Sequence, residues 1–388
     1  MAAYEALYRK WRPQTFDDIV AQPHITRTLK NQIVREKTAH AYLFVGSRGT
    51  GKTTCARIFA KAVNCLHPKD GNPCLECENC RDAEAGTLTD IIEIDGASNN
   101  GVGEVRSLRD NAAYLPVRCK YKVYIIDEVH MMSAGAFNAL LKMIEEPPEY
   151  VKFILATTDL KNIPNTITSR CQRYDFRRIP GSMIAEYLQS ILDANSLVAD
   201  EGALKRITTL SEGSMRDALS LLDRVSTMSD SGHITLEGTL NALGRMDMSM
   251  FAAYVRNILE GRASSNIRLF NESLNKGVSE EQFLIDFLWY LKNIFLCKAS
   301  GAAEKDAFSA NDYADLTDLA DQIDDAKLDS LIALFDRTRK ETTYSRSRRV
   351  LIEVALIEAG LPDSEERMAD LRERMNQSMM TMERLSET

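Results

Sequence analysis

The chain has 388 residues, of which 44% are hydrophobic and 27% charged, as in an ordinary globular protein. Its length predicts two or three domains of ~150 residues each. No apolar run approaches the ~20 residues that a membrane-spanning helix needs, which argues against an integral membrane protein, and the N-terminus lacks the pattern of a secretory signal. We therefore expect a cytoplasmic protein with no membrane partner. The net charge of −8 gives no overall attraction to nucleic acid, but residues 1–60 hold ten Lys and Arg against four Asp and Glu and allow a locally basic surface.

The first predicted strand, Tyr42–Val45, runs directly into a glycine-rich turn and a helix. The turn, Gly46–Thr53, fits the whole G-x-x-x-x-G-K-[ST] pattern of a loop that binds nucleotide triphosphates. Its glycines let successive N–H groups point at phosphate oxygens, and the helix that begins near Lys52 adds its positive end. We expect Lys52 to reach the β- and γ-phosphates of ATP and Thr53 to hold Mg²⁺. The predicted nucleotide-binding residues of this loop are Gly46, Ser47, Arg48, Gly49, Thr50, Gly51, Lys52, Thr53 and Thr54.

A cysteine cluster follows within an insertion at about residues 64–82. Cys65, Cys74, Cys77 and Cys80 have the spacing C-x8-C-x2-C-x2-C. Four thiolates brought to one point are typical of a structural Zn²⁺ site with no open position. Two alternatives are disulfides, which a reducing compartment disfavours, and an iron–sulfur cluster, in which the C-x2-C-x2-C spacing also occurs. A colourless purified protein would favour zinc.

A pair of acids ends the apolar run Val123–Ile126. An acid at the carboxyl end of a parallel strand lies beside the phosphate loop. Asp127 is suited to hold Mg²⁺ through its water shell, and Glu128 is suited to polarise the attacking water. Thr157 and Thr158 end the next strand, where either hydroxyl would reach the γ-phosphate or that water. Paired with the upstream loop, these residues predict an ATPase rather than a solvated Asp-Glu turn.

Five short apolar runs alternate with connections long enough for helices, which predicts a doubly wound α/β fold around a parallel sheet. The expected strands are Tyr42–Val45, Ile91–Ile94, Val123–Ile126, Phe153–Ala156 and Tyr174–Phe176. The best-defined connecting helix is Ala136–Glu146, which carries an apolar face and ends at Pro147-Pro148.

The strand pattern disappears after Pro180. Residues 181–243 predict four short helices, the third beginning after an N-cap at Ser214, and from about residue 247 the chain is predicted to be all helical. Ser279–Lys298 has one broad apolar face, and Glu365–Leu385 carries a methionine stripe that favours core or partner packing. We expect three domains: 1–180, with the zinc insertion, then a small helical domain over 181–244, then a helical domain over 245–388.

Phosphoryl transfer needs further positive charge near the γ-phosphate, and two arginines are candidates. Arg216 lies early in a predicted helix of the second domain, from which it would reach back across a cleft to the nucleotide. Arg170, in Ser169-Arg170-Cys171, would face away from this chain's own phosphate loop and serve a neighbouring subunit. Both are otherwise read as surface arginines.

Taken together, these motifs resemble the gamma/tau subunits of the bacterial DNA polymerase III clamp loader, which are AAA+ ATPases. The resemblance covers about residues 4–245 with specific motifs, and the later helices only in general character. Its motifs here are Tyr8–Val20, Gly46–Thr53, the four cysteines, Asp127–His130, Ser169–Cys171 and Gly213–Ala218. It implies an AAA+ P-loop domain with a zinc insertion, a helical lid and a helical collar that oligomerises.

The resemblance also implies residue roles. Lys52 and Thr53 match the Walker A motif, Asp127 and Glu128 the Walker B motif, and Thr158, or Thr157, sensor 1. Arg216 matches sensor 2, Arg170 the arginine finger that acts on the neighbouring subunit, and the four cysteines the zinc ligands. The Arg9–Val20 segment, including Arg12 and Val20, matches the stretch that borders adenine and ribose.

The partners implied are delta and delta-prime subunits and further copies of the chain in a pentameric ring, the sliding clamp, and primer–template DNA on the bacterial nucleoid. DNA would be held by its phosphates, through helix N-termini after Asn99–Gly103 and near Thr166. The ring would open the clamp and release it on DNA when ATP is hydrolysed, and the chain would carry no polymerase active site.

Two other functions compete with this interpretation. A different AAA+ class, such as a branch-migration helicase or an initiator, would need a duplex-tracking hairpin or a helix-turn-helix domain, for which the sequence has no signature. A scaffold that binds ATP only to hold its shape is disfavoured by intact Lys52, Asp127 and Glu128.

Overall fold

The computed structural model describes residues 6–361, with the exception of 229–231, 243–247, 276, 302–307, 309, 344 and 346. The chain forms two compact units, one that ends at Ile234 and one that begins at Thr235. The first unit thus contains the predicted boundary at 180/181, and the three-domain division stays a prediction. Within the described residues, no helix is long and apolar enough to cross a bilayer.

A five-stranded parallel sheet forms the centre of the first unit, in the order β2-β3-β4-β1-β5. The strands are β1 (Ala41–Val45), β2 (Ile91–Asp95), β3 (Lys122–Asp127), β4 (Val151–Thr157) and β5 (Gln172–Asp175). Every residue of β4 is buried, whereas the edge strands β2 and β5 are largely accessible. The parallel sheet predicted from the apolar runs is confirmed. Phe176, predicted as strand, lies just past β5 but still donates its N–H to the Val45 carbonyl (2.7 Å).

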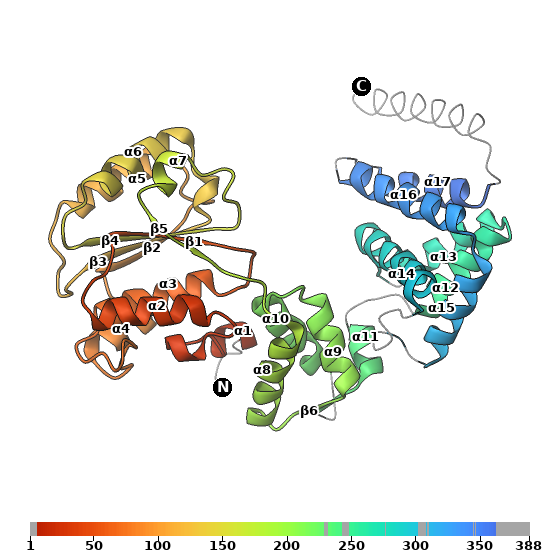
Figure 1. Ribbon diagram of the computed structural model, residues 1–388, viewed down its shortest axis with the longest axis horizontal. Coiled ribbons are helices and arrows are strands. Elements are labelled where there is room, and N and C mark those ends of the chain that lie inside the picture. The colour runs from red at the N-terminus through yellow and green to blue at the C-terminus, as the bar shows by residue number, and fades with distance from the viewer. Residues whose placement is uncertain are drawn as a thin grey trace. The chain divides into compact units, whose positions relative to one another are not determined.

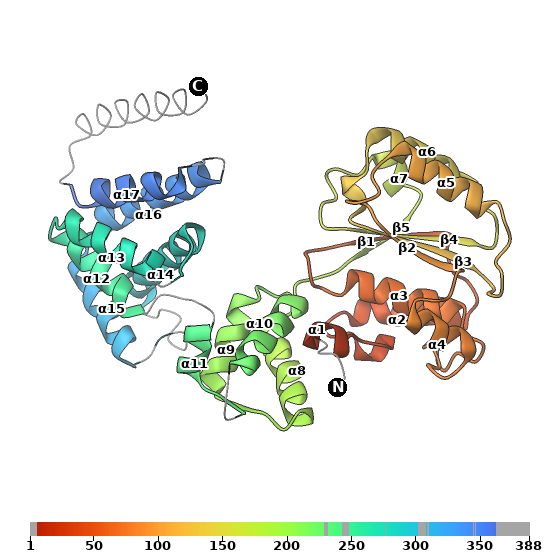
Figure 2. The same ribbon diagram turned by 180° about the vertical axis from the view of Figure 1, so that it is seen from behind.

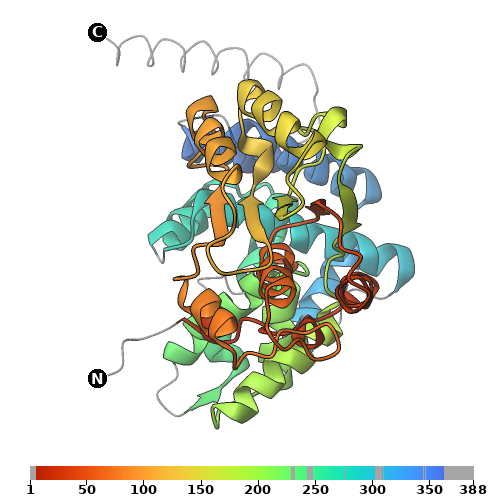
Figure 3. The ribbon, with the colours of Figure 1, turned by 90° about the vertical axis from the view of Figure 1, so that its left-hand side faces the viewer.

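Helices cover both faces of this sheet (Figures 1 and 2). One layer contains α5 (Val102–Ala112), α6 (Ala134–Glu145) and α7 (Asn165–Thr168), and the other contains α2 (Pro23–Val34), α3 (Lys52–Val63) and α4 (Glu78–Ala85). In Figure 3 the strands lie between the yellow helices and the red helices. Alternate residues of each central strand enter opposite cores: Leu43 packs with α6, and Phe44 packs with α3.

The strand order brings three loops together at one edge. Because β4 lies between β1 and β3, the end of β4 at Thr157 stands between the loop after Val45 and the acid at Asp127. The backbone joins two of these ends, since the Gly46 N–H donates to the Thr157 carbonyl (3.2 Å). The carboxyl edge of a parallel sheet is where such folds bind ligands.

The part of the first unit that follows β5 is mainly helical and contains α8 (Gly181–Ala194), α9 (Glu201–Leu210) and α10 (Met215–Thr227), whereas the short helix α1 (Leu7–Lys10) precedes the sheet. Ser214 caps α10 as predicted, its Oγ accepting the Asp217 N–H (3.3 Å). A two-residue parallel pair, β6 (Val198–Ala199) with β7 (His233–Ile234), was not predicted, because strands this short leave no periodic pattern. The fourth predicted helix, α11 (Leu236–Ala242), follows Ile234.

The described residues of the second unit after α11 form six helices: α12 (Met248–Leu259), α13 (Ala263–Asn275), α14 (Glu280–Ser300), α15 (Ala310–Gln322), α16 (Asp325–Thr342) and α17 (Arg348–Ala359). Their core is aromatic, with Phe287 of α14 stacked on Phe251 (5.8 Å) and edge-on to Phe335 (4.7 Å). The predicted helix Ser279–Lys298 corresponds to α14, with Ser279 as its N-cap. The predicted helix Glu365–Leu385 lies outside the described residues.

Candidate nucleotide site and metal centre

The phosphate loop leaves β1 and enters α3 through left-handed glycines. Gly49 has φ 74° and Gly51, the N-cap of α3, has φ 101°, values that residues with a Cβ rarely adopt. A Cβ on Gly49 would come 1.9 Å from the hydroxyl oxygen of Ser214. Because the Met215 N–H also donates to the Gly49 carbonyl (3.1 Å), helix α10 begins directly on the phosphate loop.

Lys52 lies inside the loop and is only 5% exposed. Its Nζ donates to the carbonyl oxygens of Gly46 (2.8 Å) and Ser47 (2.9 Å). Burial lowers the pKa of Lys52, and the nearby Glu128 and Asp127 act against that shift. A largely buried ammonium among loop amides is suited to meet a phosphate oxygen.

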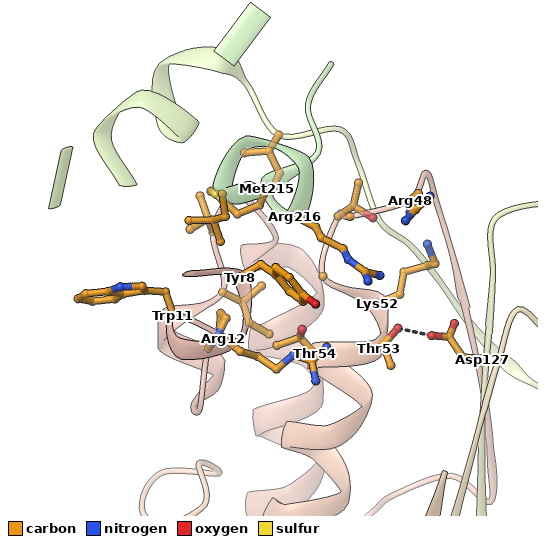
Figure 4. Close-up of a pocket in the computed structure, with 18 of the residues that line it drawn as sticks. Tyr8, Trp11, Arg12, Arg48, Lys52, Thr53, Thr54, Asp127, Met215 and Arg216 are labelled. Carbon is orange, nitrogen blue, oxygen red and sulfur yellow. Dashed lines mark hydrogen bonds between the residues drawn. The ribbon is translucent and has the colours of Figure 1, made fainter. Parts of the chain in front are cut away.

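The two predicted acids follow β3 beside this loop. Thr53 donates its hydroxyl to Asp127 Oδ2 (2.6 Å, dashed in Figure 4), and Asp127 Oδ1 accepts the Glu128 N–H (2.9 Å). A hydroxyl and a carboxylate at this spacing fit Mg²⁺, which takes oxygen ligands and keeps several waters. Glu128 has φ 45°, a strained left-handed conformation that costs about 1–3 kcal/mol and is typical of functional sites.

The two threonines that end β4 have different partners. Thr158 donates its hydroxyl (2.9 Å) and its N–H (3.3 Å) to Glu128 Oε2. Thr157 is fully buried, and its hydroxyl donates to the Asp159 carbonyl (2.9 Å). Of the two residues left open by the sequence, Thr158 is therefore the one that hydrogen-bonds the predicted catalytic acid.

A pocket of about 410 Å³ opens over the phosphate loop, between the N-terminal segment, residues 8–20, and α10 (Figure 4). Of the candidate nucleotide-binding residues, 48–54, Asp127, Glu128, Arg12 and Val20 line it, whereas Gly46 and Ser47 are not among its lining residues and accept hydrogen bonds from Lys52. Burial, followed by the charge of Arg57, lowers the pKa of Arg12. The loop, the acids and the N-terminal segment, far apart in the sequence, thus share one cavity.

Trp11 and Ile19 line the pocket within the predicted segment Arg9–Val20, but sequence reasoning missed the other apolar lining, which is contributed by Tyr8, Ile179, Tyr187, Met215 and Leu219. The Tyr187 hydroxyl donates to the Trp11 carbonyl (2.9 Å), joining α8 to the N-terminal segment. The two aromatic residues of Tyr8-x-x-Trp11 were an available signal. Tyr187 and Leu219 are ordinary positions of amphipathic helices and gave none. An apolar rim next to a phosphate loop fits a purine ring.

The two candidate arginines lie in different places. Arg216 extends from α10 into the pocket, with its guanidinium 5.3 Å from the centroid of the Tyr8 ring (Figure 4). Arg170 is not among the pocket residues. It forms an ion pair with Glu145 at the end of α6 (2.8 Å) and donates to the Thr166 carbonyl (2.8 Å).

The four clustered cysteines converge beside α4, with all their sulfur atoms within 4.8 Å of one another. Cys65 and Cys77 are 3.9 Å apart and Cys74 and Cys80 are 4.0 Å apart, sulfur to sulfur. A disulfide would need about 2.05 Å. Thiolates at ~2.3 Å from one tetrahedral ion stand about 3.8 Å apart, so the cluster fits a single ion, whereas a four-iron cluster would spread its ligands over different irons. Burial raises the pKa of the Cys80 thiol; for Cys74 it acts in the same direction, but amide hydrogen bonds from Cys77 and Glu76 outweigh it and lower the pKa to about 6.

Comparison with known proteins gives matches along the chain. Residues 21–180 match the family described as DNA polymerase III, delta subunit, and residues 183–230 match the DNA polymerase III clamp loader subunit, ATPase lid domain. Residues 234–371 match DNA polymerase III subunits gamma and tau domain III.

Three curated relatives extend over most of the chain. The DNA polymerase III subunit tau of Bacillus subtilis is 42% identical over 96% of this chain and 66% of its own length. The tau subunit of Escherichia coli is 39% identical over 92% and 55%. The gamma subunit of Buchnera aphidicola from Acyrthosiphon pisum is 36% identical over 91% of this chain and 98% of its own length. The chain therefore spans about 55–66% of these tau subunits and nearly the whole of this gamma subunit.

Proposed function

Since the chain belongs to the gamma/tau family of DNA polymerase III clamp-loader subunits, we propose that it is the ATP-dependent motor of a sliding-clamp loader. Binding of ATP makes a ring of subunits competent to hold the clamp open, and hydrolysis releases the clamp on primed DNA in the cytoplasm. The observation that carries this proposal is the shared pocket: the buried Lys52, the Thr53–Asp127 pair and Glu128 all meet at one cavity rimmed by apolar side chains.

Each group of the pocket has a role in hydrolysis. Lys52 and the loop amides hold the β- and γ-phosphates of ATP, and Thr53 with Asp127 holds Mg²⁺. When bound, Mg²⁺ neutralises charge that develops on the phosphates. Glu128 orients and deprotonates the attacking water, and Thr158 holds the Glu128 carboxylate. Tyr8, Trp11, Arg12 and Val20 border the base and ribose.

The lid and the ring complete the site. Helix α10 begins on the phosphate loop, so Arg216 senses the γ-phosphate from the lid, residues 181–244. Residues 245–388 form the collar that joins the subunits. Arg170, outside its own pocket, reaches the nucleotide of the next subunit in a ring with delta, delta-prime and further copies of the chain. Primer–template DNA lies against the helix N-termini near Asn99–Gly103 and Thr166, held by its phosphates.

Capture of the sliding clamp tests this function. We expect the reconstituted ring to retain a labelled clamp on beads in the presence of Mg²⁺ and a slowly hydrolysed ATP analogue, and to lose it with ADP. Capture that does not depend on the nucleotide would contradict the proposal. Unwinding of a forked duplex by the chain alone would instead favour a helicase of the same fold.

We propose that the cysteine cluster holds structural zinc, because its sulfur atoms already stand at the spacing of one tetrahedral ion. Replacing Cys80 by Ser is expected to remove the metal and to lower the unfolding temperature of the first unit. A loss of ~3 kcal/mol would correspond to roughly 6–12 °C. Metal analysis of the purified protein should find a single zinc ion per chain and no iron.

The matched control for the zinc prediction is Cys171→Ser, which changes a cysteine of the same unit outside the cluster. It should keep the metal content of the unmodified protein. Equal zinc in the Cys80 and Cys171 variants, or iron with a visible absorption band, would contradict the assignment.

A further inference from the structure

His130 stands behind the predicted catalytic acid, on the 3-10 turn Val129–Met131 that follows β3. Its Nδ1 lies 3.3 Å from Glu128 Oε2 and 3.1 Å from Thr157 Oγ1. The ring is not among the residues that line the nucleotide pocket, whereas Glu128 is. Of the two residues that His130 Nδ1 contacts, Glu128 is the one that lines the pocket.

The hydrogen bonds around Thr157 indicate which nitrogen of His130 carries the proton. The single hydroxyl hydrogen of Thr157 is donated to the Asp159 carbonyl (2.9 Å), and the Thr157 oxygen also accepts the Asp159 N–H (3.0 Å). Because Thr157 has no second hydrogen to give, the contact with His130 is satisfied when Nδ1–H donates. The same nitrogen lies 3.3 Å from Glu128 Oε2, so the N–H places positive partial charge next to that carboxylate oxygen.

The carboxylate of Glu128 is consequently held at one oxygen. Oε2 accepts from the Thr158 hydroxyl and from the Thr158 N–H, and His130 Nδ1 lies 3.3 Å from the same oxygen. These contacts join the acid to the buried end of β4, whose Thr157 carbonyl also anchors the first residue of the phosphate loop. They oppose the relaxation of Glu128 from its left-handed backbone conformation and leave Oε1 for the water.

We propose that His130 is a positioning residue for ATP hydrolysis. Its Nδ1–H donates to the Thr157 hydroxyl oxygen and, from 3.3 Å, fixes the orientation of the Glu128 carboxylate. This inference rests on the proposed ATPase function and adds a residue to that site. A displacement of about 1 Å in a catalytic group can cost 10²-fold in rate. Loss of the N–H should therefore lower kcat and leave ATP binding in place.

Three substitutions separate positioning from packing. His130→Asn keeps an N–H donor near the place of Nδ1, His130→Gln moves its donor toward the place of Nε2, and His130→Ala removes it. We expect kcat in the reconstituted ring to fall about 10–10²-fold for the Ala and Gln variants and to recover to within several-fold of the unmodified protein for Asn. The Kd for ATP, followed by fluorescence of Trp11 in a Trp289→Phe background, should stay unchanged in all three.

A double-mutant cycle supplies the second readout. If His130 acts through Glu128, adding His130→Ala to Glu128→Gln should cause no further loss of kcat, because residues that act as a unit are not additive. Unchanged turnover in His130→Ala, an Asn variant no better than Gln, or losses that add in the cycle would each overturn the inference. If the unmodified ring itself hydrolyses no ATP, the proposed function falls and this role falls with it.

Discussion

Replacing Lys52 by Ala is expected to abolish ATP hydrolysis and clamp loading, with a loss of about 10³-fold or more in turnover. The side chain is buried in the loop and is the only lysine among the described residues that line the pocket, so the variant loses the ammonium that would meet the phosphates. Removal of one preorganised donor already costs about 10²–10³-fold in other enzymes. The measurement is phosphate release by the ring in the presence of clamp and primed DNA.

The control for Lys52 is Lys37→Ala, which removes an exposed lysine far from the pocket residues in the sequence. It should retain full activity. Trp11, which lines the pocket, reports the binding step: in a Trp289→Phe background, ATP should change its fluorescence in the unmodified loop and far less in the Lys52 variant. A Lys52→Ala ring that loads clamps at the normal rate would end the proposed mechanism.

Replacing Arg170 by Ala is expected to leave ATP binding intact and to slow hydrolysis in the ring by about 10³-fold or more, the range measured for arginines supplied to a neighbouring site. Arg170 does not line the described nucleotide pocket of its own chain, and it forms an ion pair with Glu145 at the end of α6. Turnover and the Kd for ATP, measured on the same preparation, separate the two effects.

Mixing experiments then show which subunit Arg170 serves. Rings made from Arg170→Ala and Lys52→Ala chains should regain part of the activity, because some interfaces combine an intact loop with an intact arginine. Arg173→Ala is the matched control, since Arg173 is exposed on the neighbouring strand and pairs with Asp175 (2.6 Å). Equal kinetics for the Arg170 variant and this control would refute the assignment.

The central strands of the sheet could be predicted from the pattern of apolar residues in short stretches of the sequence. Strands β1, β3 and β4 were predicted within a few residues, because central strands of a parallel sheet are buried on both faces and read as continuous apolar runs. Strand β5 was displaced, since three of its four residues are exposed at the sheet edge. The β6–β7 pair was missed because two residues have no period.

The candidate site divides in the same way. The phosphate loop, the acid pair and the cysteine cluster could be predicted, because residues close together in the chain form each of them and their spacing is recognisable. Thr157 and Thr158 could not be separated by sequence, since both end the same strand and only the direction of each side chain decides its partner. In the structure Thr158 donates to Glu128, and Thr157 lies buried against His130 and Asp159.

The amino-acid sequence alone determined the motifs that residues close together in the chain form, because local backbone geometry is enough to assemble them. These motifs are the phosphate loop Gly46–Thr53 and the cysteine spacing C-x8-C-x2-C-x2-C. The meeting of that chemistry in one pocket depended on strand order, which sets β4 between β1 and β3. The apolar rim from Tyr8 and Tyr187, the docking of α10 on Gly49 and the contact of His130 with Thr157 emerged from packing alone. Contacts between distant segments follow from how whole elements bury their apolar faces, and no short window of residues encodes them.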